Sequence, residues 1–87
     1  MHSVILVVEL PNDDRPWESF LARAKLGGEL STSVQRLGQN VWQLNIQAEL
    51  APLSRILGAA DGLGLTYKML VFDAEPQWLP GNAIRKP

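Results

Sequence analysis

The chain contains no cysteine, which excludes disulfide bonds, thiolate nucleophiles and cysteine-ligated zinc sites together. Its one histidine, His2, lies at the second position, where we expect a solvated side chain and not a general base held within reach of a substrate. Serine–histidine and cysteine–histidine catalysis is therefore excluded. We expect no catalytic residue, no metal site and no cofactor, so the sequence favours a non-catalytic role over an enzyme.

Charge of either sign is also scarce. Eight Lys and Arg against nine Asp and Glu give a net charge of -1, and only 20% of the residues are charged. The basic residues are scattered and no RNP1-like sequence is present, so we expect no nucleic-acid binding. The N-terminal apolar run over residues 4–8 is far shorter than the roughly 18 residues of a membrane span, and it has no signal-peptide flanks. We therefore expect a cytoplasmic protein with no membrane partner.

What is present is apolar material for one small domain. Hydrophobic residues make up 46% of the 87, and this length fits a single domain. A β-branched run predicts a strand over residues 3–10. Helical spacing after a cap at Asn12, Asp13 or Asp14 predicts a helix that ends at the Gly27–Gly28 pair. The apolar stripe of this helix is Trp17, Phe20, Leu21 and Ala24.

The segments 30–37 and 41–47 read as a hairpin around Gly38-Gln39-Asn40. A two-residue loop at Gly38-Gln39 would pair apolar residues with polar ones. A three-residue loop pairs like with like on each face, so we prefer it. It places Arg36 opposite Trp42 in a cation–π contact, and it also pairs Val34 with Leu44, Gln35 with Gln43, Ser33 with Asn45, Thr32 with Ile46, and Leu30 with Ala48.

The second half of the chain predicts a helix over residues 48–63 and a strand over residues 65–73. Pro52 falls in the first turn of this helix, where proline is tolerated, and Gly62 and Gly64 end it. Its expected apolar stripe is Leu50, Leu53, Ile56, Leu57 and Ala60. Residues 74–87 show no periodicity and form either a tail or an extension that covers an edge of the domain.

This β-α-β-β-α-β order resembles the ferredoxin-like superfold, by topology alone. The resemblance implies an α+β fold in which a four-stranded antiparallel sheet of order 4-1-3-2 carries both helices on one face. Residues 1–73 would then form one domain and residues 74–87 the extension. Since this superfold hosts many unrelated functions, the function has to be argued from a site.

Pairing the first and last strands predicts which side chains face away from the helices. With Glu9 opposite Lys68, the open face would carry Ile5, Val7, Leu70 and Phe72, and the helix side would carry Val4, Leu6, Val8, Met69 and Val71. Four large apolar side chains need a cover. We expect either a second subunit or the tail with Trp78, Leu79 and Ile84. Trp78 is then either the anchor of the tail or an exposed contact for a partner.

A small-molecule site is a separate expectation, at the loop after the first strand. Asp14-Arg15-Pro16 resembles the turn that follows the first strand in ACT domains, although Trp17 stands where that turn has glycine. The resemblance implies a ligand site at Asn12, Asp13, Asp14 and Arg15, whose ligand is unknown. Asp13 and Asp14 would also serve a Mg²⁺-dependent nuclease or phosphoryl-transfer enzyme, and capping of the helix is the alternative role for the same residues.

These observations favour a small binding or interaction module that works as an oligomer, such as a homodimer, or as an accessory protein. The expected interface is the open sheet face. The alternative is a small enzyme of the dimeric α+β-barrel type, with a cavity between the helices and the sheet that offers Arg36, Trp42 and Tyr67 to a small molecule.

Overall fold

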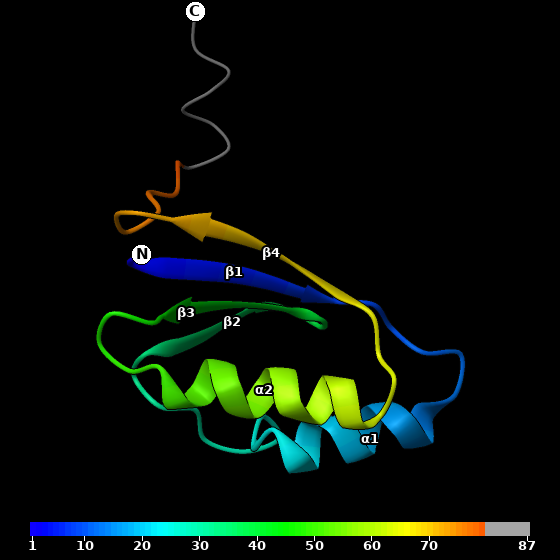
Figure 1. The fold of residues 1–87 in the computed structure, drawn as a ribbon. Coiled ribbons are helices and arrows are strands. Elements are labelled where there is room, and N and C mark those ends of the chain that lie inside the picture. The colour runs from blue at the N-terminus through cyan, green and yellow to red at the C-terminus, as the bar shows by residue number, and fades with distance from the viewer. Residues whose placement is uncertain (80–87) are drawn as a thin grey trace, which may run out of the picture.

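The computed structural model describes residues 1–79 as two layers, a sheet and a pair of helices that cover one face of it (Figure 1). The elements are β1 (Ser3–Val8), α1 (Asp14–Arg23), β2 (Val34–Gly38), β3 (Val41–Asn45), α2 (Ala51–Gly62) and β4 (Tyr67–Phe72). The antiparallel sheet has the order β2-β3-β1-β4. This is the ferredoxin-like topology, and it confirms the predicted α+β fold. Residues 74–79 form no helix or strand, and the rest of the predicted tail, including Ile84, lies outside the described residues.

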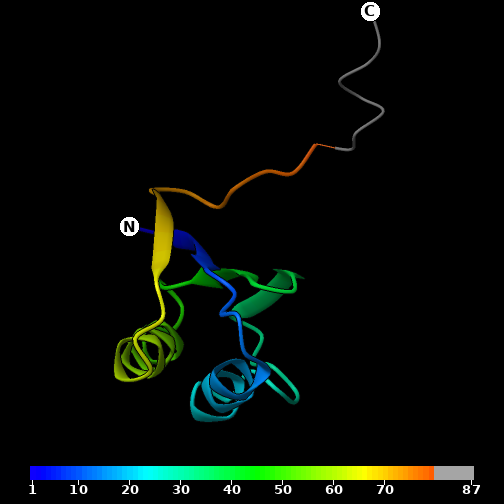
Figure 2. The same ribbon diagram turned by 90° about the vertical axis from the view of Figure 1, so that its right-hand side faces the viewer.

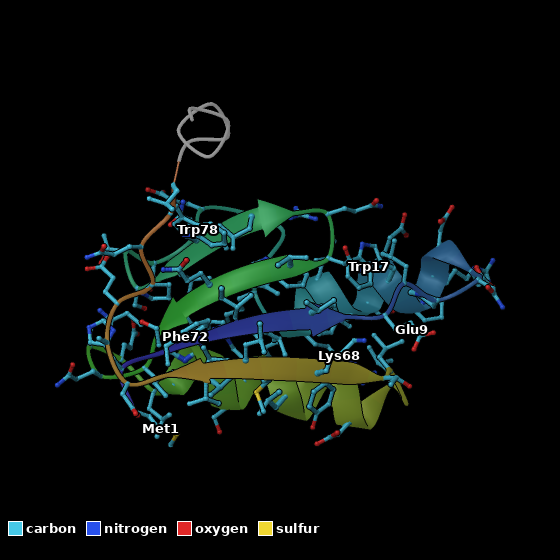
Figure 3. The ribbon with its side chains drawn as sticks, turned by 90° about the horizontal axis from the view of Figure 1, so that it is seen from above. Met1, Glu9, Trp17, Lys68, Phe72 and Trp78 are labelled. Atoms are coloured by element: carbon cyan, nitrogen blue, oxygen red, sulfur yellow. The ribbon has the colours of Figure 1, made fainter. Side chains whose placement is uncertain are left out.

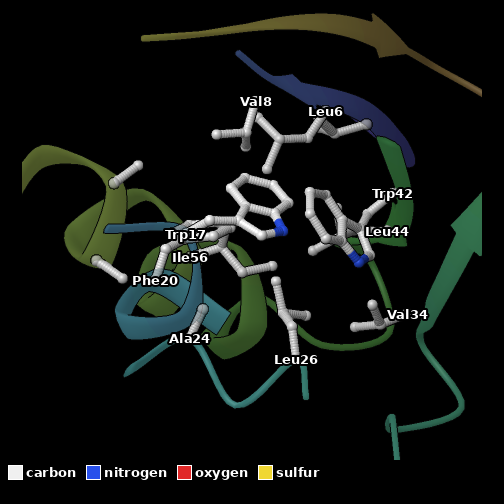
Figure 4. Close-up of a cluster of buried hydrophobic side chains, with 13 residues drawn as sticks. Leu6, Val8, Trp17, Phe20, Ala24, Leu26, Val34, Trp42, Leu44 and Ile56 are labelled. Atoms are coloured by element: carbon white, nitrogen blue, oxygen red, sulfur yellow. The ribbon is translucent and has the colours of Figure 1, made fainter. Parts of the chain in front are cut away.

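The core between the layers is built around three aromatic rings (Figure 4). The ring centroids of Trp17 and Phe20, both on α1, lie 5.2 Å apart, and each lies 6.0 Å from the centroid of Trp42 on β3. The core positions predicted for Trp17 and Trp42 are therefore confirmed. The buried Nε1–H of Trp42 has no hydrogen-bond partner among the described residues, which costs about 1–3 kcal/mol.

The β2–β3 hairpin has the predicted register but a shorter ladder. Val34 lies opposite Leu44, and Arg36 lies opposite Trp42 with its guanidinium carbon 5.5 Å from the indole centroid. A bulge before Gly38 places that residue opposite Val41, which leaves a two-residue turn instead of the three-residue loop. The predicted pairs of Thr32 with Ile46 and of Leu30 with Ala48 are not part of the ladder. The hydroxyls of Ser31 and Ser33 bond to each other and to Glu49, and such local bonds compete with a ladder.

The register between β1 and β4 is two residues away from the predicted one. Lys68 lies opposite Val7, not Glu9, and Leu70 lies opposite Ile5. A slip of an even number of residues keeps every side chain on its face, so the predicted division of faces holds. The connection from α2 decides the register, since Thr66 is already paired with Glu9 through a backbone bond of 2.8 Å.

Both helices end in the same hydrogen-bonding pattern, the Schellman motif. Leu65 N–H donates to the Ala60 carbonyl at the end of α2, and Leu26 N–H donates to the Leu21 carbonyl at the end of α1. The motif needs one left-handed residue. In α2 it is Gly64 (φ 69°), as its sequence suggests, but in α1 it is Lys25 (φ 57°). The predicted stop at Gly27–Gly28 is therefore wrong.

The early turn at Lys25 has a physical reason, because it places Leu26 in the core with 3% of its surface exposed. A turn delayed to Gly27 would carry this side chain past the core. Arg55 of α2 adds a hydrogen bond from its Nε to the Ala24 carbonyl (3.0 Å), where the helix dipole favours a cation.

The second helix begins later than predicted and covers less of the sheet. It starts at Ala51, with Pro52 in its first turn, and Leu50 is 61% exposed instead of facing the core. Met69 and Val71, predicted to be core residues, are 41% and 51% exposed. The side chains that α2 buries are small or medium-sized (Pro52, Ile56, Ala59 and Ala60), and Met69 and Val71 on the helix side of β4 stay exposed.

Candidate functional site

The face of the sheet turned away from the helices is divided into two halves (Figure 3). The apolar half comes from β1 and β4 and consists of the predicted residues Ile5, Val7, Leu70 and Phe72. Leu70 is 63% exposed, and the other three are half-buried. The polar half comes from β2 and β3 and carries Gln35, Gln43 and Asn45.

The segment 74–79 leaves the end of β4 and turns over the open face toward the hairpin (Figures 2 and 3). Trp78 donates a hydrogen bond of 2.9 Å from its Nε1 to the Oε1 of Gln43, so it contacts the polar half. The indole is nevertheless 62% exposed, and Leu79 is 70% exposed. This segment is therefore attached to the domain, but it does not cover the apolar half.

Strand β4 is exposed on both of its faces. Leu70 is exposed on the open face, and Met69 and Val71 are exposed on the helix face. Sequence patterning found Leu70 but assigned Met69 and Val71 to the core. The signal that could have found them is the topology itself, because β4 is an edge strand and a helix covers an edge strand less fully than a central one.

The N-terminus is part of the sheet, which corrects the prediction of a solvated His2. The His2 N–H donates to the Phe72 carbonyl (2.8 Å), and the His2 carbonyl accepts from Ile46. Its Nδ1 lies 2.6 Å from the Oγ of Ser3. Ser3 is only 1% exposed, so this hydroxyl is not accessible to a substrate, and the pair holds the strand end in place.

Two residues of the predicted ligand loop, Asp13 and Asp14, stand at the start of α1. Asp13 caps α1, accepting from the Arg15 N–H at 3.2 Å, and Asp14 opens the helix. Of the four predicted ligand residues, Asn12 lines a hollow of about 250 Å³, between the segment 9–11 and the α2–β4 connection (Gly64, Leu65 and Thr66). Within residues 1–79 no group of three or more His, Cys, Asp or Glu side chains is placed to hold a metal ion.

A larger hollow of about 620 Å³ lies at the end of β1. Glu9 and Lys68 line it, together with Val7, Leu10, Asn40, Thr66 and Tyr67. Its volume is in the usual range for small-molecule sites, about 300–1,000 Å³. The sequence missed it because the predicted register placed Glu9 directly opposite Lys68, whereas the observed one offsets them by two residues.

Two polar contacts lie near the two ends of α2, and each shifts the pKa of one of its members. The hydroxyls of Ser33 (2.7 Å) and Ser31 (3.0 Å) donate to the Glu49 carboxylate, and these bonds lower the pKa of Glu49. The Tyr67 hydroxyl donates to Asp61 (3.1 Å), and this bond raises the pKa of Tyr67. The first contact joins the segment before β2 to the segment before α2, and the second joins β4 to α2.

The fold and the exposed surface define a small α+β protein of ferredoxin-like topology, in which residues 1–79 leave one sheet face uncovered by the helices. Comparison with protein-family models gives no match, and neither the curated proteins nor the solved structures include one that matches the chain. Among residues 1–79, neither helix is long and apolar enough to cross a membrane.

Proposed function

We propose that this chain is a non-catalytic interaction module that works as an oligomer or as an accessory subunit. Its binding surface is the apolar half of the open face, with Trp78 as an additional exposed aromatic contact. The observation that carries the proposal is the exposure of Leu70, 63%, beside two further exposed apolar residues of the same strand. A cytoplasmic location fits a chain that has no cysteine to oxidise.

The energy of burial supports this assignment. A fully buried aliphatic side chain contributes roughly 1.5–3 kcal/mol relative to an exposed one, so covering Leu70, which is 63% exposed, favours association. Clustered apolar side chains of this kind mark interaction sites more often than isolated ones do. Among the described residues, Lys68 is the one cation on the β1 and β4 side of the open face, and a single positive charge is too little to bind a nucleic-acid backbone.

Sedimentation velocity over a range of protein concentrations tests the proposal. We expect the wild-type chain to self-associate and Leu70→Glu to weaken this by about tenfold or more, since a carboxylate would be desolvated in the interface. Gln35→Glu, an exposed residue of the polar half, is the matched control and should associate as the wild type does. A wild-type chain that stays monomeric at every concentration would overturn the oligomeric form of the proposal.

The hollow lined by Glu9 and Lys68 favours a second candidate, a site for a small molecule. Of Arg36, Trp42 and Tyr67, the residues expected in the cavity of an α+β-barrel type of enzyme, only Tyr67 lines it. An acidic and a basic residue at one hollow suit a small molecule with both charges. Amide chemical shifts of Glu9, Thr66 and Lys68, followed by NMR during titration with free glycine, test this candidate. Shifts confined to these residues and lost in Lys68→Met would support it, and no change at millimolar glycine would count against it.

A further inference from the structure

The backbone groups of β4 divide into two sets. The Glu9 N–H donates to the Thr66 carbonyl (2.8 Å), while the Val8 N–H donates to the Asn40 carbonyl on the other side of β1 (3.0 Å). Bonded and non-bonded pairs alternate along antiparallel strands, so the odd-numbered residues of β1 bond to the even-numbered residues of β4. The N–H and C=O groups that point out of the sheet are therefore those of Tyr67, Met69 and Val71.

Apolar side chains are exposed beside these outward groups on both faces of the strand. Met69 and Val71 are exposed on the helix face, and Leu70 is exposed on the open face. The segment 74–79 turns away from this edge toward the hairpin (Figure 3). An occupant of the edge must supply extended backbone together with apolar side chains on both faces, which is what a β-strand supplies.

The opposite edge of the sheet is closed to such pairing. The helix side of β2 is covered, with Val34 only 8% exposed, and its ladder is interrupted by the bulge before Gly38. Arg36 folds back on this strand, donating to the carbonyls of Gly38 (3.1 Å) and Gln39 (2.6 Å). Charged residues and bulges are the features by which sheet edges avoid further strands.

Within residues 1–79 one edge of the sheet is open, and the same edge of another copy can pair with it in a closed two-fold contact that forms no filament. We infer that the occupant is a second copy of this chain, with β4 paired antiparallel to β4 across a two-fold axis at Leu70. The two four-stranded sheets join into one sheet of eight strands with all helices on the same side. This inference rests on the proposed interaction function and names its partner, but it moves the contact from the open face to the edge at Leu70, and Ile5 and Val7 on β1 stay uncovered in this dimer.

Polarity and charge select the register centred on Leu70. It places Met69 opposite Val71 and Lys68 opposite Phe72 of the second copy, and it separates the two Lys68 side chains by four residues, about 13 Å along the strands. A register centred on Met69 brings the two ammonium groups within two residues, about 7 Å along the strands. A register centred on Val71 places the Asp73 carboxylate against Met69.

Amide hydrogen exchange, followed by NMR, tests the pairing residue by residue. In the dimer, the amides of Met69 and Val71 bond to the second copy, and we expect them to exchange about tenfold or more slowly than in a Leu70→Glu chain held monomeric. The amides of Lys68 and Leu70 bond to β1 in both states and serve as internal controls. Equal exchange of the Met69 and Val71 amides in the dimer and in the monomer would overturn the inference.

Single cysteines introduced into this cysteine-free chain test the register. Opposed residues in a bonded pair have Cα atoms about 5.5 Å apart, within the range that a disulfide spans. A mixture of Met69→Cys and Val71→Cys chains, one of them isotope-labelled, should therefore oxidise mainly to the mixed dimer. Each variant alone places its two Cα atoms about 8 Å apart, too far for an unstrained disulfide, so it should give little covalent dimer.

The same experiment distinguishes failure of this inference from failure of the proposed function. Cross-linking of Val7→Cys chains, without the mixed Met69–Val71 product, means that the open faces associate and the edges do not. That result overturns the edge pairing and supports the proposed interaction surface. A chain that gives none of these products and sediments as a monomer overturns the edge pairing and the oligomeric form of the proposed function together.

Discussion

The two halves of the molecule, β1–α1–β2 and β3–α2–β4, follow the same order of elements but bury their edge strands differently. The first helix buries two large aromatic side chains, Trp17 and Phe20, and the helix side of its edge strand is covered at Val34. The second helix buries smaller side chains, and Met69 and Val71 of its edge strand stay exposed. The volume of the helix side chains therefore helps to decide which edge strand becomes core and which becomes a binding surface.

Among the variants that test this comparison, we expect the largest change in stability when an aromatic ring is removed from the first half. Phe20 is fully buried, so Phe20→Ala should lower the free energy of unfolding by about 3–5 kcal/mol. Val71→Ala, on the exposed edge strand, should cost less than about 1 kcal/mol. Urea denaturation of both variants in the Leu70→Glu background excludes any contribution from self-association. Similar losses for the two variants would mean that β4 is as deeply buried as α1.

The cations of the two edge strands should also differ. Arg36 lies over the Trp42 indole and donates to two backbone carbonyls, so Arg36→Ala should cost about 1–1.5 kcal/mol. Lys68→Ala, on β4, should change stability by less than about 0.5 kcal/mol. The same denaturation experiment measures both. An equal effect would remove the distinction between a closed edge and an open one.

The ends of the two helices allow a smaller and more local test. Lys25 and Gly64 hold the same left-handed position in their Schellman motifs. Lys25→Gly should stabilise the fold by about 0.5–1 kcal/mol, because it removes the steric cost of a side chain at positive φ. Gly64→Ala should destabilise it by about 1 kcal/mol, since the added Cβ meets no neighbour within 4 Å and only the backbone is strained. Thermal unfolding that shifts in the same direction for both variants would contradict this reading.

The sequence predicted strand pairing correctly where the polarity of the residues on both strands selected one register. The hairpin register followed from matching residues of like polarity, because it places Gln35 opposite Gln43 and Val34 opposite Leu44. The β1–β4 register could not be found in this way, since both strands are apolar on both faces and a two-residue slip leaves the pattern unchanged. Lys25 was missed because the demand for its left-handed conformation comes from the burial of Leu26, a contact that the local sequence does not record.

The candidate site was predicted in part for a related reason. Periodicity assigns a residue to a face of the sheet, and it assigned Leu70 correctly. How far a helix covers a face of the sheet depends on the volume of the side chains between the layers. Periodicity alone therefore could not predict that Met69 and Val71 are exposed. The loop at Asn12–Arg15 shows the converse case, because Asp13 has the right type for a ligand-binding role and uses its carboxylate to cap α1.

The smallest expected effect is a difference in pH dependence between the two ends of α2. The pKa of Glu49 is lowered by the Ser33 and Ser31 hydroxyls, so this carboxylate stabilises the fold above its ordinary pKa of 4.5, and the contribution is lost as the pH falls through the lowered value. The pKa of Tyr67 is raised above 10.0 by Asp61, so its contribution is present below pH 10.0 and is lost as the pH rises through the raised value. Both groups are solvent-exposed, and the shifts in melting temperature should therefore be small. Glu49→Gln should flatten only the acid limb of melting temperature against pH, and Tyr67→Phe only the alkaline limb. If either variant altered the opposite limb, the contact assigned to it could not be the cause.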